Sequence, residues 1–171
     1  MNKKQSRIKN GIMLLGIVGL LIALDQWSKA LVRDQIALGS EVYPIPFLAP
    51  FFRFTYWKNT GAAFGIFQNA NLPLLILSIL IAGALIWLYF KSEDEPLIFR
   101  ISLAMMLGGA IGNMIDRISF GFVTDFIAVG RFPVFNIADS AVTVGVGIML
   151  ITMLIHERKT KSETADGAQS E

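Results

Sequence analysis

The chain has 171 residues, of which 54% are hydrophobic and only 16% are charged, and its formal net charge is +2. Soluble domains carry about 25% charged residues, so this composition and a mean hydropathy of +0.57 indicate a membrane protein of one domain. The absence of cysteine excludes disulfides, thiolate metal sites and a cysteine nucleophile. The sequence lacks the basic runs interleaved with aromatic residues that would suggest nucleic-acid binding. The HExxH, Walker and GxGxxG motifs are also absent.

Four apolar stretches approach the ~20 residues that a helix needs to cross the hydrocarbon core. The first begins at Gly11 and continues to about Val32, without the cleavage site that follows the apolar region of a signal peptide. The others are Leu72–Phe90, Pro96–Ile115 and Ile137–Ile155. Because only the polar turn Lys91–Glu95 separates the second and third, these should form a helical hairpin. The sequence therefore predicts a mainly α integral membrane protein with four transmembrane helices.

Lysine and arginine set the orientation through the positive-inside rule. Four spans place both termini on one side, which carries nine of these residues against six on the other side. Four of the nine precede the first span, so both termini are expected in the cytoplasm. One peptidase domain is predicted over residues 1–157, and the polar residues 158–171 are expected to be a disordered cytoplasmic tail.

The long connection between the first and second spans has a strand pattern. Phe51–Trp57 alternates with a period of two and is rich in aromatic residues. Aromatic side chains favour the membrane interface, and others occur nearby at Tyr43, Phe47, Phe64 and Phe67. We therefore expect a small amphipathic β-sheet and aromatic loop on the outer membrane face, forming one wall of a site.

With this topology, polar side chains from distant parts of the sequence converge near the outer face. They are Asp25, Asn59, Asn113, Asp116, Asp125, Asn136 and Asp139. Ionisable groups in membrane segments are costly and mark functional sites by default. Their shared depth is not expected of side chains with independent structural roles.

Asp125 and Asp139 are the candidate catalytic pair. Asp139 begins the last apolar stretch, where a helix cap is the alternative role, although Asn136 can already provide that cap. Asp125, in GFVTDFIAVG, has apolar neighbours that disfavour its charged form; the alternative is a solvated turn residue. Two close carboxylates share one proton, so the ionised one can take a proton from water while the protonated one polarises a peptide carbonyl and later protonates the leaving amine. This is peptide hydrolysis without a covalent intermediate, which suits a chain that lacks cysteine.

Several neighbouring residues have two open interpretations. Asn113 and Asn136 can hydrogen-bond the aspartate pair or the substrate backbone, and Asn59 lies in a turn that can bring its amide over the site. Asp116 and Arg117 form either a structural ion pair or part of the site, and Asp25 with Lys29 can be an internal salt bridge. The GxxxG motif at Gly108 and Gly112 suits helix packing or a groove for a bound helix or lipid chain.

Five segments together resemble the lipoprotein signal peptidase family, also called signal peptidase II. They are DQWSK (Asp25–Lys29), KNTGAAFGIF (Lys58–Phe67), GGAIGNMIDR (Gly108–Arg117), FVTDF (Phe122–Phe126) and FPVFNIADS (Phe132–Ser140). They occur in the family's order and extend from the first to the fourth span.

The resemblance implies an aspartic endopeptidase of the bacterial cytoplasmic membrane, with its active site near the outer face. Its substrates are prolipoproteins with a diacylglyceryl group on the lipobox cysteine, and it cuts just before that cysteine. It implies Asp125 and Asp139 as catalytic residues. The supporting or substrate-binding residues that it implies are Asn59, Asn113, Arg117, Asn136 and Asp25. It further implies contact with membrane lipid, inhibition by globomycin-like cyclic peptides, and no metal or cofactor.

Two other classes of protein also use membrane carboxylates or packed small residues. A proton-coupled transporter or channel would distribute polar groups through the membrane depth. A non-catalytic assembly factor would use the GxxxG motif and the interface sheet only to dock partners.

Overall fold

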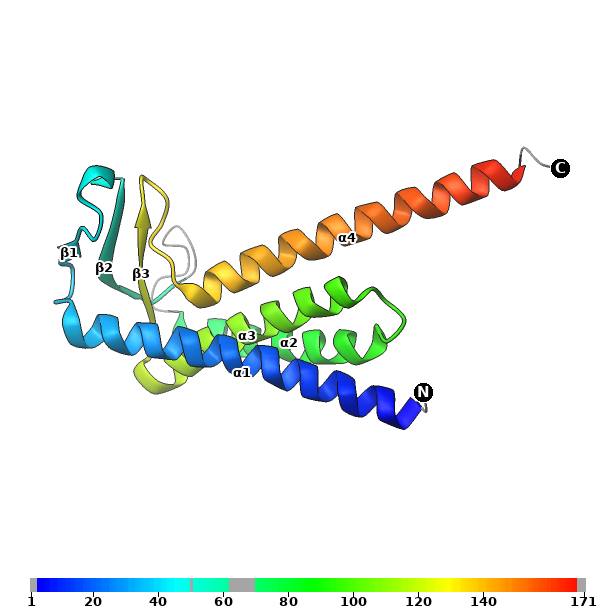
Figure 1. Ribbon diagram of the computed structural model, residues 1–171. Coiled ribbons are helices and arrows are strands. Elements are labelled where there is room, and N and C mark those ends of the chain that lie inside the picture. The colour runs from blue at the N-terminus through cyan, green and yellow to red at the C-terminus, as the bar shows by residue number, and fades with distance from the viewer. Residues whose placement is uncertain (1–2, 50, 62–69, 169–171) are drawn as a thin grey trace.

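A computed structural model describes residues 3–49, 51–61 and 70–168 of the chain. In the described part, four long helices form a bundle with a small sheet at one end (Figure 1). The elements in chain order are α1 (Lys3–Gln35), β1 (Glu41–Val42), a 3-10 turn (Pro46–Leu48), β2 (Phe52–Asn59), α2 (Asn71–Lys91), α3 (Leu97–Phe120), β3 (Val123–Val129) and α4 (Ile137–Ala168). All four helices are long and apolar enough to span a membrane, which confirms the predicted fold class.

Helix α3 is the centre of the bundle, because α1, α2 and α4 all pack against it. Glycines permit the closest of these approaches. A Cβ atom on Gly109 would lie 2.3 Å from the carbonyl oxygen of Ala138 in α4, and one on Gly108 would lie 3.0 Å from the Cβ of Leu21 in α1. The small residues of α3 therefore serve helix packing, as one interpretation of the GxxxG motif predicted.

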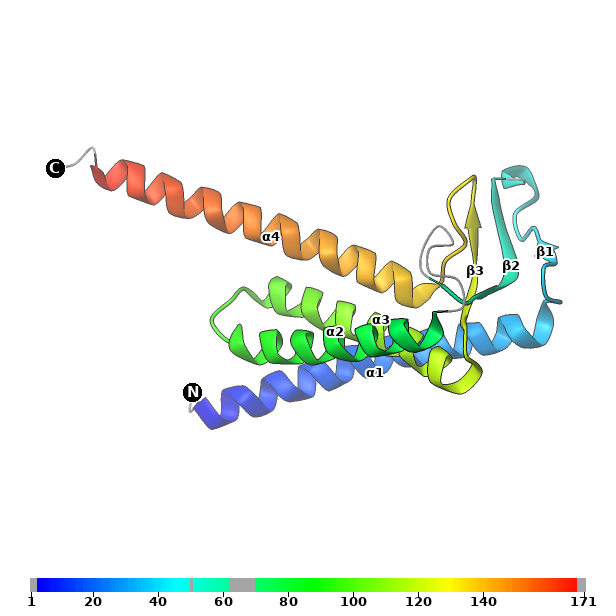
Figure 2. The same cartoon turned by 180° about the vertical axis from the view of Figure 1, so that it is seen from behind.

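The three strands form an antiparallel sheet in the order β1-β2-β3. Strand β2 confirms the strand predicted at Phe51–Trp57, although its burial does not alternate and its pairing with β3 is irregular between Phe54 and Trp57. Trp57 lies opposite Asp125 of β3. The sheet packs on the bundle through a buried cluster that includes Val32, Tyr56 and Phe126. Figure 2 shows the sheet from behind, standing across the end of the helices. The predicted interface aromatics Phe64 and Phe67 lie outside the described residues.

Strand β3 was not predicted; the sequence left open that Asp125 is a solvated turn residue. The segment is rich in β-branched and aromatic residues, which favour strands, but it does not alternate between buried and exposed positions: its first four residues are all buried. Burial on both faces removes the period-two pattern. The αL conformation of Gly121, with φ of 77°, ends α3 and turns the chain into β3.

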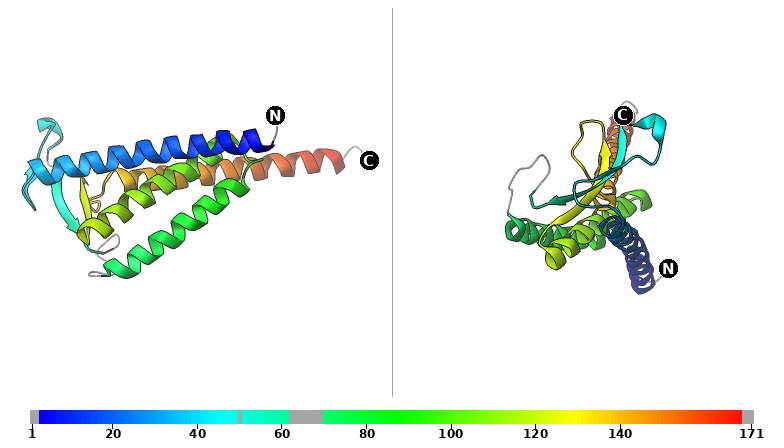
Figure 3. Two further views of the ribbon diagram at one scale, coloured as in Figure 1. Left: turned by 90° about the horizontal axis from the view of Figure 1, so that it is seen from below. Right: turned by 90° about the vertical axis from the view of Figure 1, so that its left-hand side faces the viewer.

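Both termini lie at the end of the bundle opposite the sheet (Figure 3). Helix α4 continues to Ala168, whereas the sequence favoured a disordered tail from residue 158. The helix persists because no proline or glycine occurs between Gly147 and Gly167. The division of the chain after residue 157 stays a prediction.

Candidate active site

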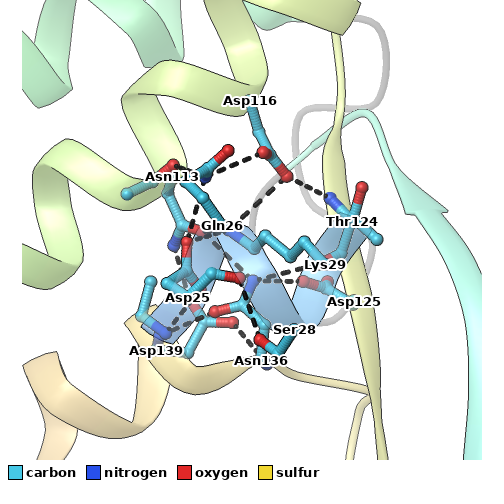
Figure 4. A network of polar contacts seen from close by, with 12 residues as sticks. Asp25, Gln26, Ser28, Lys29, Asn113, Asp116, Thr124, Asp125, Asn136 and Asp139 are labelled. Atoms are coloured by element: carbon cyan, nitrogen blue, oxygen red, sulfur yellow. Dashed lines mark hydrogen bonds and ion pairs between the residues drawn. The ribbon is translucent and has the colours of Figure 1, made fainter. Parts of the chain in front are cut away.

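Polar side chains from α1, α3, β3 and the start of α4 meet where the sheet joins the bundle (Figure 4). The cluster comprises Asp25, Gln26, Ser28, Lys29, Asn113, Asp116, Thr124, Asp125, Asn136 and Asp139. Asn59 joins it from the end of β2. The structure thus gathers the predicted site residues at one end of the bundle, and their catalytic or binding roles remain predictions.

Asn136 and Asp139 form a reciprocal cap at the start of α4. The Asn136 Oδ1 accepts from the Asp139 backbone N–H at 2.9 Å, and the Asp139 Oδ2 accepts from the Asn136 backbone N–H at 3.2 Å. This arrangement satisfies two donors that a helix N-terminus otherwise leaves unpaired. The other oxygen of Asp139 accepts from the Asn113 Nδ2 at 2.7 Å. The cap therefore fixes the Asp139 carboxylate as well as starting the helix.

Asp125 lies in β3 and is 1% exposed, so it is not the solvated turn residue considered above. Its two oxygens accept from the Asn136 Nδ2 at 2.7 Å and the Asn59 Nδ2 at 2.9 Å. Burial, followed by the negative charge of Asp139, raises the pKa of Asp125 to about 7, although both amides favour its charged form. Asp125 can therefore hold a proton near neutral pH.

A cavity of about 900 Å³ is lined by both Asp125 and Asp139. Its lining includes Trp57 and Lys58 of β2, and apolar residues of the connection after β3 and of three helices. The helical residues are Ile81 and Leu85 of α2, Met106 and Ala110 of α3, and Val142 of α4. The cavity thus joins the two carboxylates to an apolar space between helices, a shape that suits an extended apolar ligand.

Arg117 also lines this cavity, and its Nη2 donates to the carbonyl oxygen of Gly61 at 3.5 Å. It does not form the ion pair with Asp116 that was one interpretation of the sequence. Asp116 instead lies 3.4 Å from the Lys29 Nζ and 3.8 Å from an Arg33 nitrogen. The Arg117 side chain is therefore directed to the cavity, where it can meet a ligand carbonyl or anion.

Asp25 and Lys29 form the predicted internal salt bridge, at 2.8 Å. Neither lines the cavity, so Asp25 supports the site from behind. Its Oδ1 accepts from the backbone N–H of Ala138 at 3.0 Å. The close approach of α1 and α3 at this point depends on Gly112, where a Cβ atom would lie 2.7 Å from the Asp25 Oδ2.

Sequence reasoning missed three members of this cluster, Gln26, Ser28 and Thr124. Gln26 donates to the Gly112 carbonyl oxygen at 3.0 Å and to the Asp116 Oδ1 at 3.1 Å. The sequence clue to Gln26 is its position beside Asp25 in an apolar span, where uncharged polar side chains also need hydrogen-bond partners. Thr124 donates its backbone N–H to Asp116, a bond that no side-chain pattern reports, and its Oγ1 accepts from the Arg33 Nη1 at 3.0 Å. Over residues 3–49, 51–61 and 70–168, no three His, Cys, Asp or Glu side chains are grouped to hold a metal ion.

These features define a four-helix membrane protein with two carboxylates facing one cavity. Residues 17–155 match the family model Peptidase_A8, described as signal peptidase (SPase) II. The lipoprotein signal peptidase of Halalkalibacterium halodurans is 41% identical over 156 residues, covering 88% of this chain and 98% of the relative. That of Shouchella clausii is 42% identical over 146 residues, covering 85% and 95%.

Two solved structures are also similar to this chain in fold and in sequence. A bacterial membrane enzyme structure at 2.3 Å resolution superposes with a TM-score of 0.76 at 32% identity, covering 83% of this chain and 87% of the other. A second, at 1.9 Å resolution, gives a TM-score of 0.74 at 32% identity, with coverage of 83% and 92%.

The chain belongs to the signal peptidase II family. It is a protease of lipoprotein processing, which confirms the resemblance found in the sequence. Membership of an enzyme family sets aside the transporter and assembly-factor alternatives.

Proposed function

We propose that this protease removes the signal peptide from prolipoproteins that carry a diacylglyceryl group on the lipobox cysteine, cutting just before that cysteine. In the proposal, Asp125 and Asp139 activate the attacking water. The observation that carries it is that both carboxylates line one cavity while burial raises the pKa of Asp125 to about 7. A pair with one proton can act as base and acid together.

In the first step, Asp139 takes a proton from water and the water oxygen bonds to the peptide carbonyl carbon. Asp139 is the base because it lies in the first turn of α4, where the helix dipole favours negative charge. Asp125, which holds the shared proton, donates it to the carbonyl oxygen. The product is a neutral tetrahedral diol, and no covalent bond to the enzyme forms.

In the second step, the carbon–nitrogen bond breaks and the proton held by Asp139 passes to the leaving amine. A hydroxyl proton of the diol returns to Asp125 as the new carboxylic acid forms. Each aspartate thus ends in its starting state. The titration belongs to the pair, so both groups determine the pH range of activity.

Three amides and one cation support this chemistry in the proposal. Asn113 and Asn136 hold the carboxylates through the bonds of 2.7 Å described above. Asn59 bonds Asp125 from the side of the sheet. Arg117, which faces the cavity, binds a carbonyl of the substrate backbone.

The apolar part of the cavity favours a lipid-bearing substrate. Its helical lining can accept the side chains of the signal helix and the acyl chains. Globomycin-like cyclic peptides with an apolar chain would compete for this space.

We place the protein in the bacterial cytoplasmic membrane with both termini in the cytoplasm. The sheet and the aspartates then lie near the outer face, where the scissile bond of such a substrate also lies.

The proposal is tested by reconstituting the purified protein with a diacylglyceryl-modified prolipoprotein and following the shortening of the substrate. Cleavage should be lost in Asp125→Asn and in Asp139→Asn, with both variants folded, and should survive chelators. The matched control is Asp94→Asn, which changes an exposed aspartate at the opposite end of the bundle and should cleave normally. Full activity of either dyad variant would disprove the pair, and equally fast cleavage of unlipidated precursor would disprove the substrate.

The orientation has its own test, because the chain contains no cysteine. A membrane-impermeant maleimide applied to intact spheroplasts should label Ser40→Cys near the sheet. It should label Asp94→Cys, in the turn between α2 and α3, only after permeabilisation. The reverse pattern would invert the topology.

A further inference from the structure

Lys29 of α1 is a buried ammonium with three oxygen partners. Its side chain is 0% exposed, and its Nζ lies 2.8 Å from the Asp25 Oδ2, 2.9 Å from the Asn113 Oδ1 and 3.4 Å from the Asp116 Oδ2. The contact with Asn113 is a hydrogen bond, and the two carboxylates are ion-pair partners of the ammonium. Lys29 does not line the cavity, and it therefore acts on the substrate only through other groups.

The two carboxylates held by Lys29 each bind the chain one residue before a catalytic aspartate. Asp25 accepts from the backbone N–H of Ala138 at 3.0 Å, and Asp139 follows Ala138. Asp116 accepts from the backbone N–H of Thr124 at 2.8 Å, and the next residue is the other aspartate, Asp125. One ammonium thus connects the start of α4 with β3 (Figure 4).

The third partner of Lys29 reaches the pair directly. Because the Asn113 Oδ1 accepts from Lys29, its Nδ2 is the atom that faces Asp139, at 2.7 Å. Without the ammonium, the amide oxygen would keep only the bond from the Asn136 Nδ2, at 3.1 Å.

We propose that Lys29 is a positioning residue, which sets the separation and orientation of Asp125 and Asp139 by holding Asp25, Asp116 and Asn113 at one point. The inference rests on the proposed catalytic role of the two aspartates. A salt bridge that only neutralised Asp25 would need one partner. Here two branches end on the residue before each aspartate and the third ends on Asp139 itself, an arrangement that serves placement.

The charge of Lys29 predicts the direction in which the pKa of Asp125 changes when Lys29 is replaced. The groups that act on Asp125 come from several neighbouring elements: Lys29 of α1, Asn59 of β2, Arg117 of α3, and Asn136 and Asp139 at the start of α4. The charged Lys58 of β2 lines the same cavity. The positive charge of Lys29 lowers the pKa of Asp125 against the larger effects of burial and Asp139. Its removal should raise that pKa and shift the pH profile of cleavage to higher pH.

The test compares Lys29→Met with Lys9→Met, the same substitution at an exposed position of the same helix. Misplacing reacting groups by about 1 Å can cost 100-fold in rate, so kcat of Lys29→Met should fall about 100-fold. KM should stay within about threefold, because the cavity lining is unchanged. An infrared titration should show a raised pKa for the Asp125 carboxyl, whose band is identified by its loss in Asp125→Asn. Lys9→Met should match the unmodified protein in all three measurements.

A charge-balanced variant separates placement from stability. Lys29→Met leaves two buried carboxylates facing each other, whereas Lys29→Met with Asp25→Asn removes one charge of each sign. The double variant should fold and still show the reduced kcat. Normal kcat in the folded double variant would overturn the inference, and so would an unchanged pKa of Asp125 in Lys29→Met. Failure of both variants to fold would also overturn it, because Lys29 would then be a residue of stability. The infrared titration does not depend on cleavage, so it reports on Lys29 even where Asp125→Asn cleaves normally and the catalytic proposal fails.

Discussion

Replacing Gly109 by alanine should separate α3 from α4 directly beneath the site. The new Cβ atom would lie 2.3 Å from the carbonyl oxygen of Ala138 and 2.8 Å from the Cγ2 of Val142. Real Cβ contacts are essentially never below 3.0 Å. Because the carbonyl is backbone of α4, relief requires the two helices to move apart by about 0.7 Å, the difference between these distances.

Two consequences follow for Gly109→Ala. Overpacking of this kind costs about 1–3 kcal/mol, which for a chain of this length lowers the melting temperature by roughly 2–12 °C. The shift also displaces Ala138 and with it Asp139, so kcat should fall about 10- to 100-fold. Thermal unfolding in detergent and the prolipoprotein cleavage assay measure the two effects separately.

Gly147→Ala provides the control, since no atom lies within 4 Å of a Cβ atom built at Gly147 in α4. There alanine only improves helix propensity, by up to about 1 kcal/mol, and activity should be unchanged. If Gly109→Ala melts and cleaves like Gly147→Ala, the close approach of α3 and α4 does not position the site.

Two further predictions concern the aspartate pair and its amides. Asp125 keeps its proton up to about pH 7 in the folded protein but ionises near 3.8 in the unfolded chain, so the stability of the protein should fall as pH rises between these values. One pKa unit is worth about 1.4 kcal/mol, so the free energy of unfolding should fall by on the order of 4 kcal/mol over this pH range. Asp125→Asn cannot ionise at this position and should not show that fall. Equal pH dependence of melting in both proteins would refute this. Asn136→Ala should lose about 1–2 kcal/mol as an N-cap variant as well as most activity, whereas Asn59→Ala should chiefly raise the pKa of Asp125. Equal melting temperatures of the two alanine variants would show that Asn136 does not cap α4.

The spans and the gathering of polar residues could be predicted because each depends on a local property. A run of apolar residues has few alternatives to a membrane helix. Asn113 and Asp139 flank the connection between the third and fourth spans, so they lie at one end of the bundle. The same topological step suggested that Asn113 and Asn136 hydrogen-bond the pair, as the structure shows.

What could not be predicted depends on partners that are distant in sequence. The strand around Asp125 has no alternation because both of its faces are covered. Asp116 has Arg117 beside it in the sequence but pairs with Lys29 and Arg33 of α1. On a helix, consecutive residues point in different directions, so adjacency favoured the wrong partner. The bonds from Ala138 and Thr124 use backbone N–H groups, which every residue except proline has.

The two aspartates are asymmetric in a way that supports the proposed roles, with Asp139 as the base and Asp125 as the acid. Asp139 stands in the first turn of a helix, and one of its oxygens accepts a backbone N–H of the cap, so its negative charge is compensated by fixed dipoles. Asp125 stands on a strand, whose dipoles nearly cancel, and only side-chain amides bond it. Burial and the negative charge of Asp139 outweigh the two amides and Lys29, and they raise the pKa of Asp125 to about 7. The proposed mechanism needs one acid and one base at the same pH, and placing one aspartate at a helix N-terminus and the other on a buried strand is a way to obtain both from identical side chains.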